Sequence, residues 1–351
     1  MKPKRKSSAT KKVLTALVAM LAVVFVLLLA ATIYVEWILG KMYYDPNSQE
    51  TLSPEQIAQQ LQQDQNETLD PDASVVDSDD VDLEGVDKIE IADGVVNILL
   101  IGQDRRPGEP RARSDVMLLV TVNTKKNEVT LTSFMRDLYV QIPGYGNNRI
   151  NVPFMLGGPE LLMDTIELNF GIRPDKFVEV DFNGFQELVE LVGGIDMELT
   201  ELEAYHLNTS EDFYDFPEES WSLKEGMNRL DGKQTLAYSR IRAIDPTADF
   251  ARTERQRKVI AALIDRAMEL NLIQLNELLL QMTEMISTDM TSREILSYAR
   301  TLYPVLAEMD DVNSVRIPYE NNYYSAAIEG VGTVLVPDLP SNSAVIAEFQ
   351  K

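Results

Sequence analysis

Short apolar runs recur from residue 95 onward and predict the strands of a β-sheet. VVNILLI (95–101) and VMLLVTV (116–122) are continuous and rich in β-branched residues, which is typical of buried strands. EVTLTSF (128–134) and LYVQI (138–142) add two runs with alternating apolar positions. The sequence therefore predicts four strands between residues 95 and 142.

Helical and strand-like patterns alternate in the rest of the chain. The predicted elements are, in order, helix 160–170, strand 176–182, helix 183–192, strand 193–199, a mostly helical stretch 252–309, strands 313–319 and 330–336, and helix 341–349. Asn183 is the predicted N-cap of the helix 183–192. Strands interleaved with helices predict an α/β fold, in which a central mixed β-sheet is flanked by helices on both faces.

The N-terminal part of the chain carries a different pattern. Val13 to Val35 is a run of 23 residues without a charge. A helix of that length crosses the roughly 30 Å apolar core of a membrane, so residues 13–35 are a predicted transmembrane anchor. Residues 1–12 contain six basic residues and no acidic one, which predicts a cytoplasmic N-terminus and an extracytoplasmic remainder. A cleaved signal peptide is the alternative, although its apolar part is normally about 7–15 residues long.

An acidic segment separates this anchor from the apolar runs. Residues 45–94 hold 15 acidic residues and one base, Lys88. Low hydrophobicity and dense like charge predict a solvated linker over 36–94, with the globular domain at 95–351. A calcium site is the alternative for so many carboxylates, but no EF-hand spacing is present.

The amino-acid composition excludes several kinds of functional site. The 351 residues include no cysteine and one histidine, His206, and the formal net charge is -24. The absence of cysteine excludes disulfides, thiolate nucleophiles and cysteine-based metal sites. His206 lies in a polar stretch that we predict to be an exposed loop. The negative charge argues against nucleic-acid binding, which requires a basic face.

Charged residues of both signs cluster at the ends of the predicted strands, where the binding loops of α/β folds lie. The clusters contain Asp104 and Arg106, Arg113 and Asp115, Arg136 and Asp137, Arg149 and Asn151, and a basic stretch at 236–258. Each cluster alone is better explained by surface ion pairs. Together the arginines require an anion, because unpaired buried charge is costly.

The basic stretch contains six bases and three acids. An extended SRIR segment points Arg240 and Arg242 the same way. Asp249 is the predicted N-cap of the helix that follows, and Arg252 and Gln256 share its inward stripe. We expect the remaining bases of that helix to be solvated, namely Arg255, Arg257 and Lys258. Several arginine forks, with Mg²⁺ on one or two aspartates, describe a pyrophosphate site.

The residues also resemble a known family. The segments NILLIGQDRR, RSDVMLLVTVN, LTSFMRDLYVQIPG, NNRINVPFMLGG, FVEVDFNGFQELVELVGGIDMEL, LDGKQTLAYSRIR and DFARTERQRKVI are similar, in this order, to those of the LytR-CpsA-Psr family of bacterial cell-wall proteins. The resemblance covers Val95 to Ala267. It implies a phosphotransferase that moves a glycopolymer, such as teichoic acid or capsule, from a polyprenyl pyrophosphate carrier to a peptidoglycan sugar hydroxyl.

The resemblance also implies roles for individual residues. The implied catalytic residues are Asp104, Arg113, Asp115, Arg136 and Arg252. The implied substrate-binding residues are Arg106, Arg149, Arg240, Arg242, Asp249 and Gln256. Asp104 and Asp115 would also hold Mg²⁺ or Mn²⁺. The implied partners are the carrier-linked polymer, peptidoglycan and the membrane.

Two departures and several alternatives accompany this interpretation. Met135 replaces the family's usual proline, which predicts a less fixed turn before Arg136, and Arg149 stands at a lysine position. One alternative is hydrolysis at the same site, which makes the protein a polyprenyl-pyrophosphate phosphatase. Another is a non-catalytic lipid-binding regulator of envelope assembly. Transcriptional regulation is disfavoured by the net charge of -24 and the predicted location.

Overall fold

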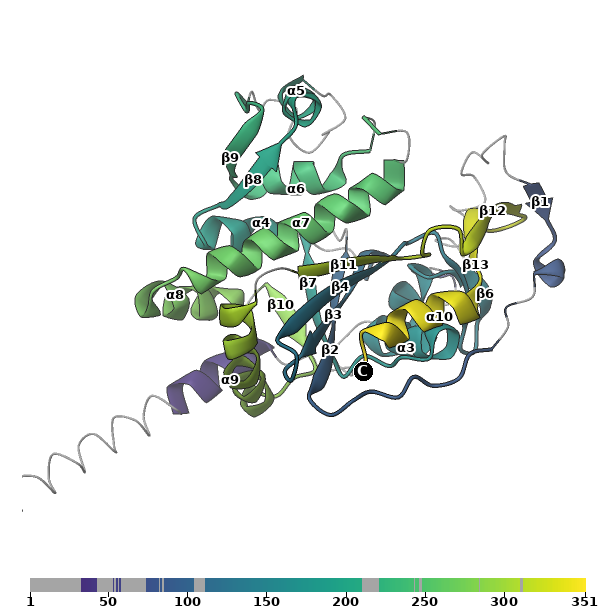
Figure 1. Ribbon diagram of the computed structural model, residues 1–351, viewed down its shortest axis with the longest axis horizontal. Helices are drawn as coiled ribbons and strands as arrows, with labels where there is room; N and C mark the ends of the chain where they lie inside the picture. The colour runs from purple at the N-terminus through teal and green to yellow at the C-terminus, as the bar shows by residue number, and fades with distance from the viewer. Residues whose placement is uncertain are drawn as a thin grey trace, which may run out of the picture.

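A six-stranded mixed sheet forms the centre of the molecule (Figure 1). The computed structural model describes residues 33–42, 53, 55, 57, 74–81, 83, 85–103, 111–209, 221–242, 244–245, 248–283, 285–309 and 312–351. The strand order is β10-β7-β2-β3-β4-β11. These strands are β2 (Val95–Gln103), β3 (Ser114–Asn123), β4 (Glu128–Phe134), β7 (Lys176–Asp181), β10 (Ile286–Thr288) and β11 (Val312–Ile317).

The pairing confirms the predicted mixture of strand directions. β3 runs antiparallel to both β2 and β4, and β10 runs antiparallel to β7. β7 and β11 instead run parallel to β2 and β4, respectively. Parallel pairs need crossover connections, and the helices of the fold supply them.

Helices cover both faces of the sheet, as predicted (Figure 1). On one face, α3 (Val152–Phe170) and α10 (Leu339–Glu348) pack against Leu99 and Ile101 of β2. On the other face, α7 (Ala248–Met268) and α9 (Ser292–Glu308) pack on a cluster that includes Leu100. Leu99 and Leu100 therefore face opposite layers, which is why β2 is apolar at consecutive positions. Helices α4 (Phe182–Leu191), α6 (Gly232–Arg240) and α8 (Leu272–Met282) extend the second layer.

Smaller elements surround this core. β12 (Tyr323–Ile328) and β13 (Gly332–Pro337) form a hairpin to which β1 (Ser74–Val76) adds a parallel strand. Two further hairpins pair β5 (Tyr139–Ile142) with β6 (Gly146–Arg149), and β8 (Ile195–Leu199) with β9 (Gly226–Leu230). Helix α5 (Glu201–Thr209) follows β8.

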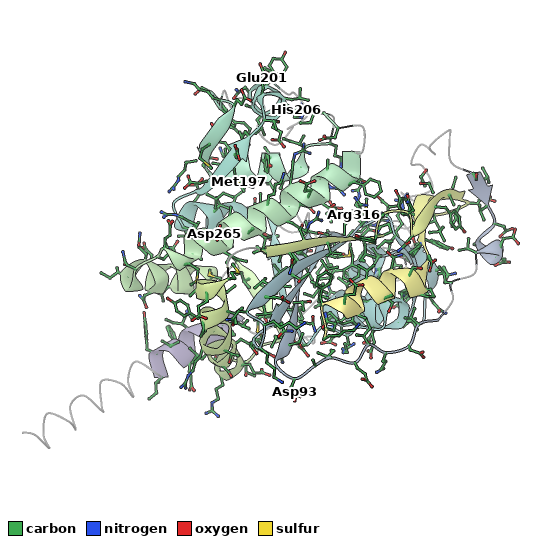
Figure 2. The ribbon with its side chains drawn as sticks, in the orientation of Figure 1. Asp93, Met197, Glu201, His206, Asp265 and Arg316 are labelled. Carbon is green, nitrogen blue, oxygen red and sulfur yellow. The ribbon has the colours of Figure 1, made fainter. Side chains whose placement is uncertain are left out.

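Three local predictions are wrong. The N-cap of α4 is Asp181, whose carboxylate accepts a hydrogen bond from the Gly184 N–H at 2.8 Å, so the helix begins before Asn183. His206 is half-buried within α5 rather than in an exposed loop (Figure 2). β10 interrupts the stretch predicted to be helical, because residues 286–288 pair with the edge strand β7.

The end of the apolar N-terminal run packs on the domain. Residues 33–39 are helical, and Ile38 and Leu39 are only 2% and 1% exposed. The Ser292 hydroxyl at the start of α9 donates to the Glu36 carbonyl at 2.8 Å. Residues 13–32 of the predicted anchor lie outside the described residues. Among the helices that are described, none combines the length and apolar composition needed to span a membrane.

The described parts of the predicted linker also contact the domain. Val75 and Val76 pair with Ala327 and Ile328 of β12, and Val81 is buried. Further on, the Ile89 N–H donates to the Gly171 carbonyl at 2.8 Å. These stretches therefore belong to the fold rather than to a solvated stalk, although the segment is acidic.

Candidate active site

The central sheet brings several of the predicted site residues together. Asp115 lies near the start of β3, and Arg136 and Asp137 lie in the turn after β4. The Met135 N–H donates to the Ile317 carbonyl at the end of β11 at 2.9 Å. A proline cannot make this bond, so the turn is fixed without one, contrary to our expectation from the sequence.

Three arginines converge on Asp249 in the first turn of α7. Its carboxylate lies 3.0 Å from Arg242 Nε, 3.2 Å from Arg252 Nη1 and 3.9 Å from Arg136 Nε. These arginines come from the segment after α6, from α7 itself and from the turn after β4. Residues far apart in the sequence thus form one compact charged cluster.

Two further carboxylates complete this cluster. Arg136 Nη1 lies 3.3 Å from Asp115 Oδ1, and Arg136 Nε lies 3.5 Å from Asp137 Oδ2. Arg149, only 3% exposed, approaches Asp137 Oδ1 with its Nε at 3.9 Å. Most of these contacts are longer than a direct charge-assisted hydrogen bond of about 2.7–2.9 Å. The groups therefore share one region without forming tight pairs.

The pKa values of Arg136 and Arg242 are shifted in opposite directions. Burial lowers the pKa of Arg136, but the carboxylates of Asp137, Asp115 and Asp249 outweigh it and hold that pKa above its ordinary value. Burial and the neighbouring charge of Arg136 instead lower the pKa of Arg242. A guanidinium remains protonated in either case, so both side chains are fixed positive charges.

Asp249 has the most perturbed carboxyl group of the cluster. Burial raises its pKa from 3.8 to about 6, and a hydrogen bond to Asp137 adds to the rise, while Arg242 and Arg136 lower it. A folded-state pKa above the ordinary value means that folding favours the protonated form. The contribution of Asp249 to stability is therefore present below about pH 4 and is lost as the pH rises to about 6.

Replacing Asp249 with asparagine is expected to remove this pH dependence. The stability of the variant relative to the wild type should rise between pH 4 and pH 6, by at most about 3 kcal/mol at 1.36 kcal/mol per unit. Thermal unfolding of both proteins, followed by circular dichroism at several pH values, measures the difference. Asp265→Asn, exposed in the second half of α7 (Figure 2), is the matched control. Parallel stability curves for Asp249→Asn and wild type would contradict the expectation.

Some donors in this cluster make no hydrogen bond to a described residue. The Nε atoms of Arg136 and Arg252 are buried and make no hydrogen bond there. Buried polar groups without hydrogen bonds are rare and costly. The carboxylate oxygens of Asp137 and Asp249 lie 3.5 Å and 3.9 Å from Arg136 Nε, too far to satisfy that donor. An anion with several oxygens is a suitable partner for such donors.

An apolar cavity of about 160 Å³ lies between the sheet and the helices of the second layer. Its walls include Leu118 of β3, Val178 of β7, Phe185 of α4 and Leu263 of α7. Gln256 also lines it and lies one turn along α7 from Arg252. The inward orientation predicted for this pair holds. The cavity therefore begins beside the arginine cluster.

Other predicted residues are placed differently. Arg240 is the last residue of α6, so SRIR is not extended, and its guanidinium lies 5.1 Å from the centre of the Phe182 ring. Arg113 lies directly before β3. Asp249 is within the first turn of α7 and is not its N-cap, since the helix already includes Ala248. Asp104 and Arg106 lie outside the described residues.

Two bases that we predicted to be solvated are buried. Arg255 contacts Glu203 at 2.8 Å and Asp245 at 2.5 Å. Arg257 donates to the hydroxyls of Ser133 and Ser314, and burial lowers its pKa to about 10. Both are covered because α7 is packed between the sheet and the α5–α6 side of the molecule. Lys258 is exposed, as expected.

The fit of a divalent cation depends on Asp115. The described residues contain no group of three or more histidine, cysteine, aspartate or glutamate side chains that could hold a metal ion. Asp115 is 31% exposed, and Arg136 contacts one of its oxygens. Mg²⁺ often takes only one or two carboxylates when phosphate oxygens complete its shell, so Asp115 is a suitable ligand.

Asp137 is a site residue that our predicted set omits. It contacts Arg136 and Arg149, and it shares a hydrogen bond with Asp249. In the sequence, Asp137 directly follows Arg136 at the end of a predicted strand. That position places Asp137 near the site, but it does not show in which direction its side chain points.

Comparison with known proteins identifies the family. The model of the LytR_cpsA_psr family matches residues 55–338. The chain belongs to the LytR-CpsA-Psr family. This assignment agrees with the resemblance in sequence and extends it at both ends, beyond Val95 and Ala267.

Individual LytR-CpsA-Psr relatives carry different names. "Regulatory protein MsrR" of Staphylococcus aureus is 29% identical over 260 residues, 73% of this chain and 75% of its own length. "Polyisoprenyl-teichoic acid--peptidoglycan teichoic acid transferase TagU" of Enterococcus faecalis is 36% identical over 199 residues, 56% of this chain and 61% of its own. A solved structure of TagT bound to LIIa-WTA has a TM-score of 0.60 and 25% identity, covering 76% of this chain and 94% of that one.

Proposed function

We propose that this protein transfers a glycopolymer from a polyprenyl pyrophosphate carrier to a sugar hydroxyl of peptidoglycan. The convergence of Arg136, Arg242 and Arg252 on one carboxylate supports the proposal most directly. Guanidinium forks suit the oxygens of a pyrophosphate, and the buried Nε donors of Arg136 and Arg252 need such a partner. The name of one relative, TagU, describes this type of reaction, the transfer of teichoic acid to peptidoglycan.

The apolar cavity supports a lipid-linked substrate. It lies beside the arginine cluster and is lined largely by aliphatic and aromatic side chains. In a lipid carrier the charged head adjoins the apolar chain. The arginine cluster and the apolar cavity adjoin each other in the same way. At about 160 Å³ the cavity accommodates only a short part of such a chain.

The proposed reaction is a direct phosphoryl transfer. The oxygen of the acceptor hydroxyl attacks the phosphorus that carries the polymer, and the bond from that phosphorus to the bridging oxygen breaks. Polyprenyl monophosphate leaves, and the polymer becomes attached through a phosphodiester. The arginines stabilise the charge that develops on the phosphate oxygens. An aspartate, Asp115 or Asp104, accepts the hydroxyl proton. Asp115 is a partly exposed carboxylate in contact with Arg136.

We also propose that Mg²⁺ or Mn²⁺ binds at Asp115 together with the substrate phosphates, with Asp104 as the second carboxylate. When bound, the ion adds positive charge that neutralises the pyrophosphate. The proposed location follows from the sequence: residues 13–35 anchor the chain in the cell membrane, the N-terminus is cytoplasmic and the domain is extracytoplasmic.

The products of the purified, full-length protein in detergent test this function. The protein is incubated with a polyprenyl-pyrophosphate-linked polymer, with and without peptidoglycan, and with Mg²⁺ or EDTA. We expect polymer covalently bound to peptidoglycan, and release of polyprenyl monophosphate that depends on the acceptor. Equal release without acceptor identifies a phosphatase, and an unchanged but bound carrier identifies a lipid-binding regulator. Transfer that continues unchanged in EDTA contradicts the proposed role of the ion.

A further inference from the structure

The hairpin of β12 and β13 is attached directly to the arginine cluster. The Leu335 N–H donates to the Asp137 carbonyl at 2.8 Å, and Arg149 Nη2 donates to the Thr333 carbonyl at 3.3 Å. These bonds join β13 to the turn that carries Arg136 and to the end of β6. The position of the hairpin is therefore fixed relative to the site.

A cavity of about 420 Å³ opens beside this hairpin. Two tyrosines, Tyr323 and Tyr324, line it together with the polar side chains of Asn321 and Asp338. Pro337 and Pro340 add rigid apolar surface. Tyr324 is 50% exposed, so its ring is accessible to a ligand.

Aromatic contacts connect this cavity to the arginine cluster. The Tyr323 ring lies 5.7 Å from the ring of Phe250, measured between centroids. Phe250 directly follows Asp249, and the guanidinium of Arg316 lies 4.1 Å from the centre of the Phe250 ring. Figure 2 shows Arg316 at the end of β11, beside the N-terminal half of α7. The ring pair of Tyr323 and Phe250 therefore links the cavity to the first turn of α7, which carries Asp249.

The walls of the cavity are held by a buried side chain. Asn342 is fully buried, and its Oδ1 accepts a hydrogen bond from the Tyr319 N–H at 2.7 Å. Its Nδ2 donates to the carbonyls of Asn322 at 2.8 Å and Asp338 at 2.7 Å. These three bonds connect the turn before β12 to the start of α10. Such preorganisation lowers the entropic cost of binding.

The lining residues match the chemistry of a sugar. Aromatic rings with polar edges provide apolar surface and hydrogen bonds together, as the faces and the hydroxyls of a pyranose require. The carboxylate of Asp338 is the charged group of the lining, and the lining includes no cation. A polymer that carries a phosphate on each repeat is repelled there, whereas an uncharged saccharide is not.

We propose that this cavity is a saccharide subsite that holds the acceptor glycan with its hydroxyl directed toward the arginine cluster. This inference rests on the proposed transferase function and adds to it the place where the acceptor binds. A sugar of the donor polymer has similar chemistry, and the experiment separates the two by charge.

Saturation-transfer NMR on the full-length protein in detergent tests the subsite. The probes are a β-1,4-linked N-acetylglucosamine hexamer and a glycerol phosphate oligomer. The hexamer should receive magnetisation, and the glycerol phosphate oligomer should not. Tyr324→Ala should weaken hexamer binding about tenfold, because it removes one stacking face. Tyr303→Ala, which removes a tyrosine on α9 that is 60% exposed, should leave binding unchanged.

The same variants separate this inference from the proposed function. Tyr324→Ala should raise the KM for the acceptor and leave carrier binding unchanged. If transfer is absent but hexamer binding depends on Tyr324, the subsite stands and the transferase proposal fails. If transfer occurs but the hexamer does not bind, or binds equally to Tyr324→Ala, the subsite is overturned. Preference for the glycerol phosphate oligomer also overturns it, in favour of a donor site.

Discussion

Replacing Arg136 with alanine is expected to slow polymer transfer by about 10²–10³-fold, the loss typical of removing one preorganised charge donor from a transition state. Arg136 contacts all three carboxylates, Asp115, Asp137 and Asp249. Its loss removes a donor to the phosphate and leaves three negative charges near an anionic substrate. The rate of polymer attachment to peptidoglycan, measured at saturating carrier, gives the effect.

Two control variants make this result interpretable. Arg136→Lys keeps the charge but loses the planar fork, so we expect an intermediate rate. Arg229→Ala removes an exposed arginine that pairs with Asp196 in the β8–β9 hairpin, and it should leave the rate within about twofold, since surface ion pairs contribute little. A rate near that of the wild type for a folded Arg136→Ala protein would remove Arg136 from the proposed machinery.

Replacing Arg255 with methionine is expected to destabilise the protein by about 3–5 kcal/mol, the usual cost of leaving one partner of a buried ion pair uncompensated. The side chains of Arg255 and Glu203 are 7% and 9% exposed. Arg255 also donates to the Ile241 carbonyl at 3.3 Å and to Asp245 at 2.5 Å. Those two residues flank Arg242, so the substitution should also weaken binding of the pyrophosphate. Urea unfolding measures the first effect, and carrier binding measures the second.

The double variant Arg255→Met/Glu203→Leu tests the cause. Replacing both charges with apolar side chains of similar size is often neutral or stabilising, so we expect most of the lost stability to return. Carrier binding should stay weak, because the bonds to Ile241 and Asp245 are still missing. A double variant as unstable as the single one would show that the unpaired charge of Glu203 is not the cause. Lost packing, or the loss of the hydrogen bonds that Glu203 accepts from the N–H and hydroxyl of Thr200, would then account for the instability.

The central strands are predictable from the sequence because both faces of the sheet are covered. Leu99 and Leu100 of β2 pack in opposite layers and must both be apolar. Helix α5 has no such signal, because Glu203 occupies a buried position where an amphipathic helix usually has an apolar residue. Its compensating partner, Arg255, lies 52 residues away, and a local pattern cannot show that pairing.

The composition of the site is predictable, but its geometry is not. A helical stripe is enough to place Arg252 and Gln256 on the inner side of α7. The same reasoning leaves Arg255 and Arg257 in solvent, because it assumes that one face of α7 is open. In the structure that helix contacts two apolar clusters, one on the sheet and one shared with α4 and α6. Because α7 is enclosed on both sides, Arg255 contacts a carboxylate and Arg257 contacts serine hydroxyls. The sequence of α7 alone does not show these partners.

Because Ile38 and Leu39 are packed against the domain, the length of the acidic segment does not determine where the domain lies relative to these residues. Residues 33–42 and 74–81 both contact the domain, so the connection between them is attached to the domain at both ends. Doubling the length of such a loop costs only about 0.6 kcal/mol, and it leaves the distance from Trp37 to the arginine cluster unchanged. With residues 13–35 as the proposed membrane anchor, the side chains that hold residues 36–39 against α9 and β10 set the height of the domain above the membrane. Insertions into the acidic segment should not alter that height.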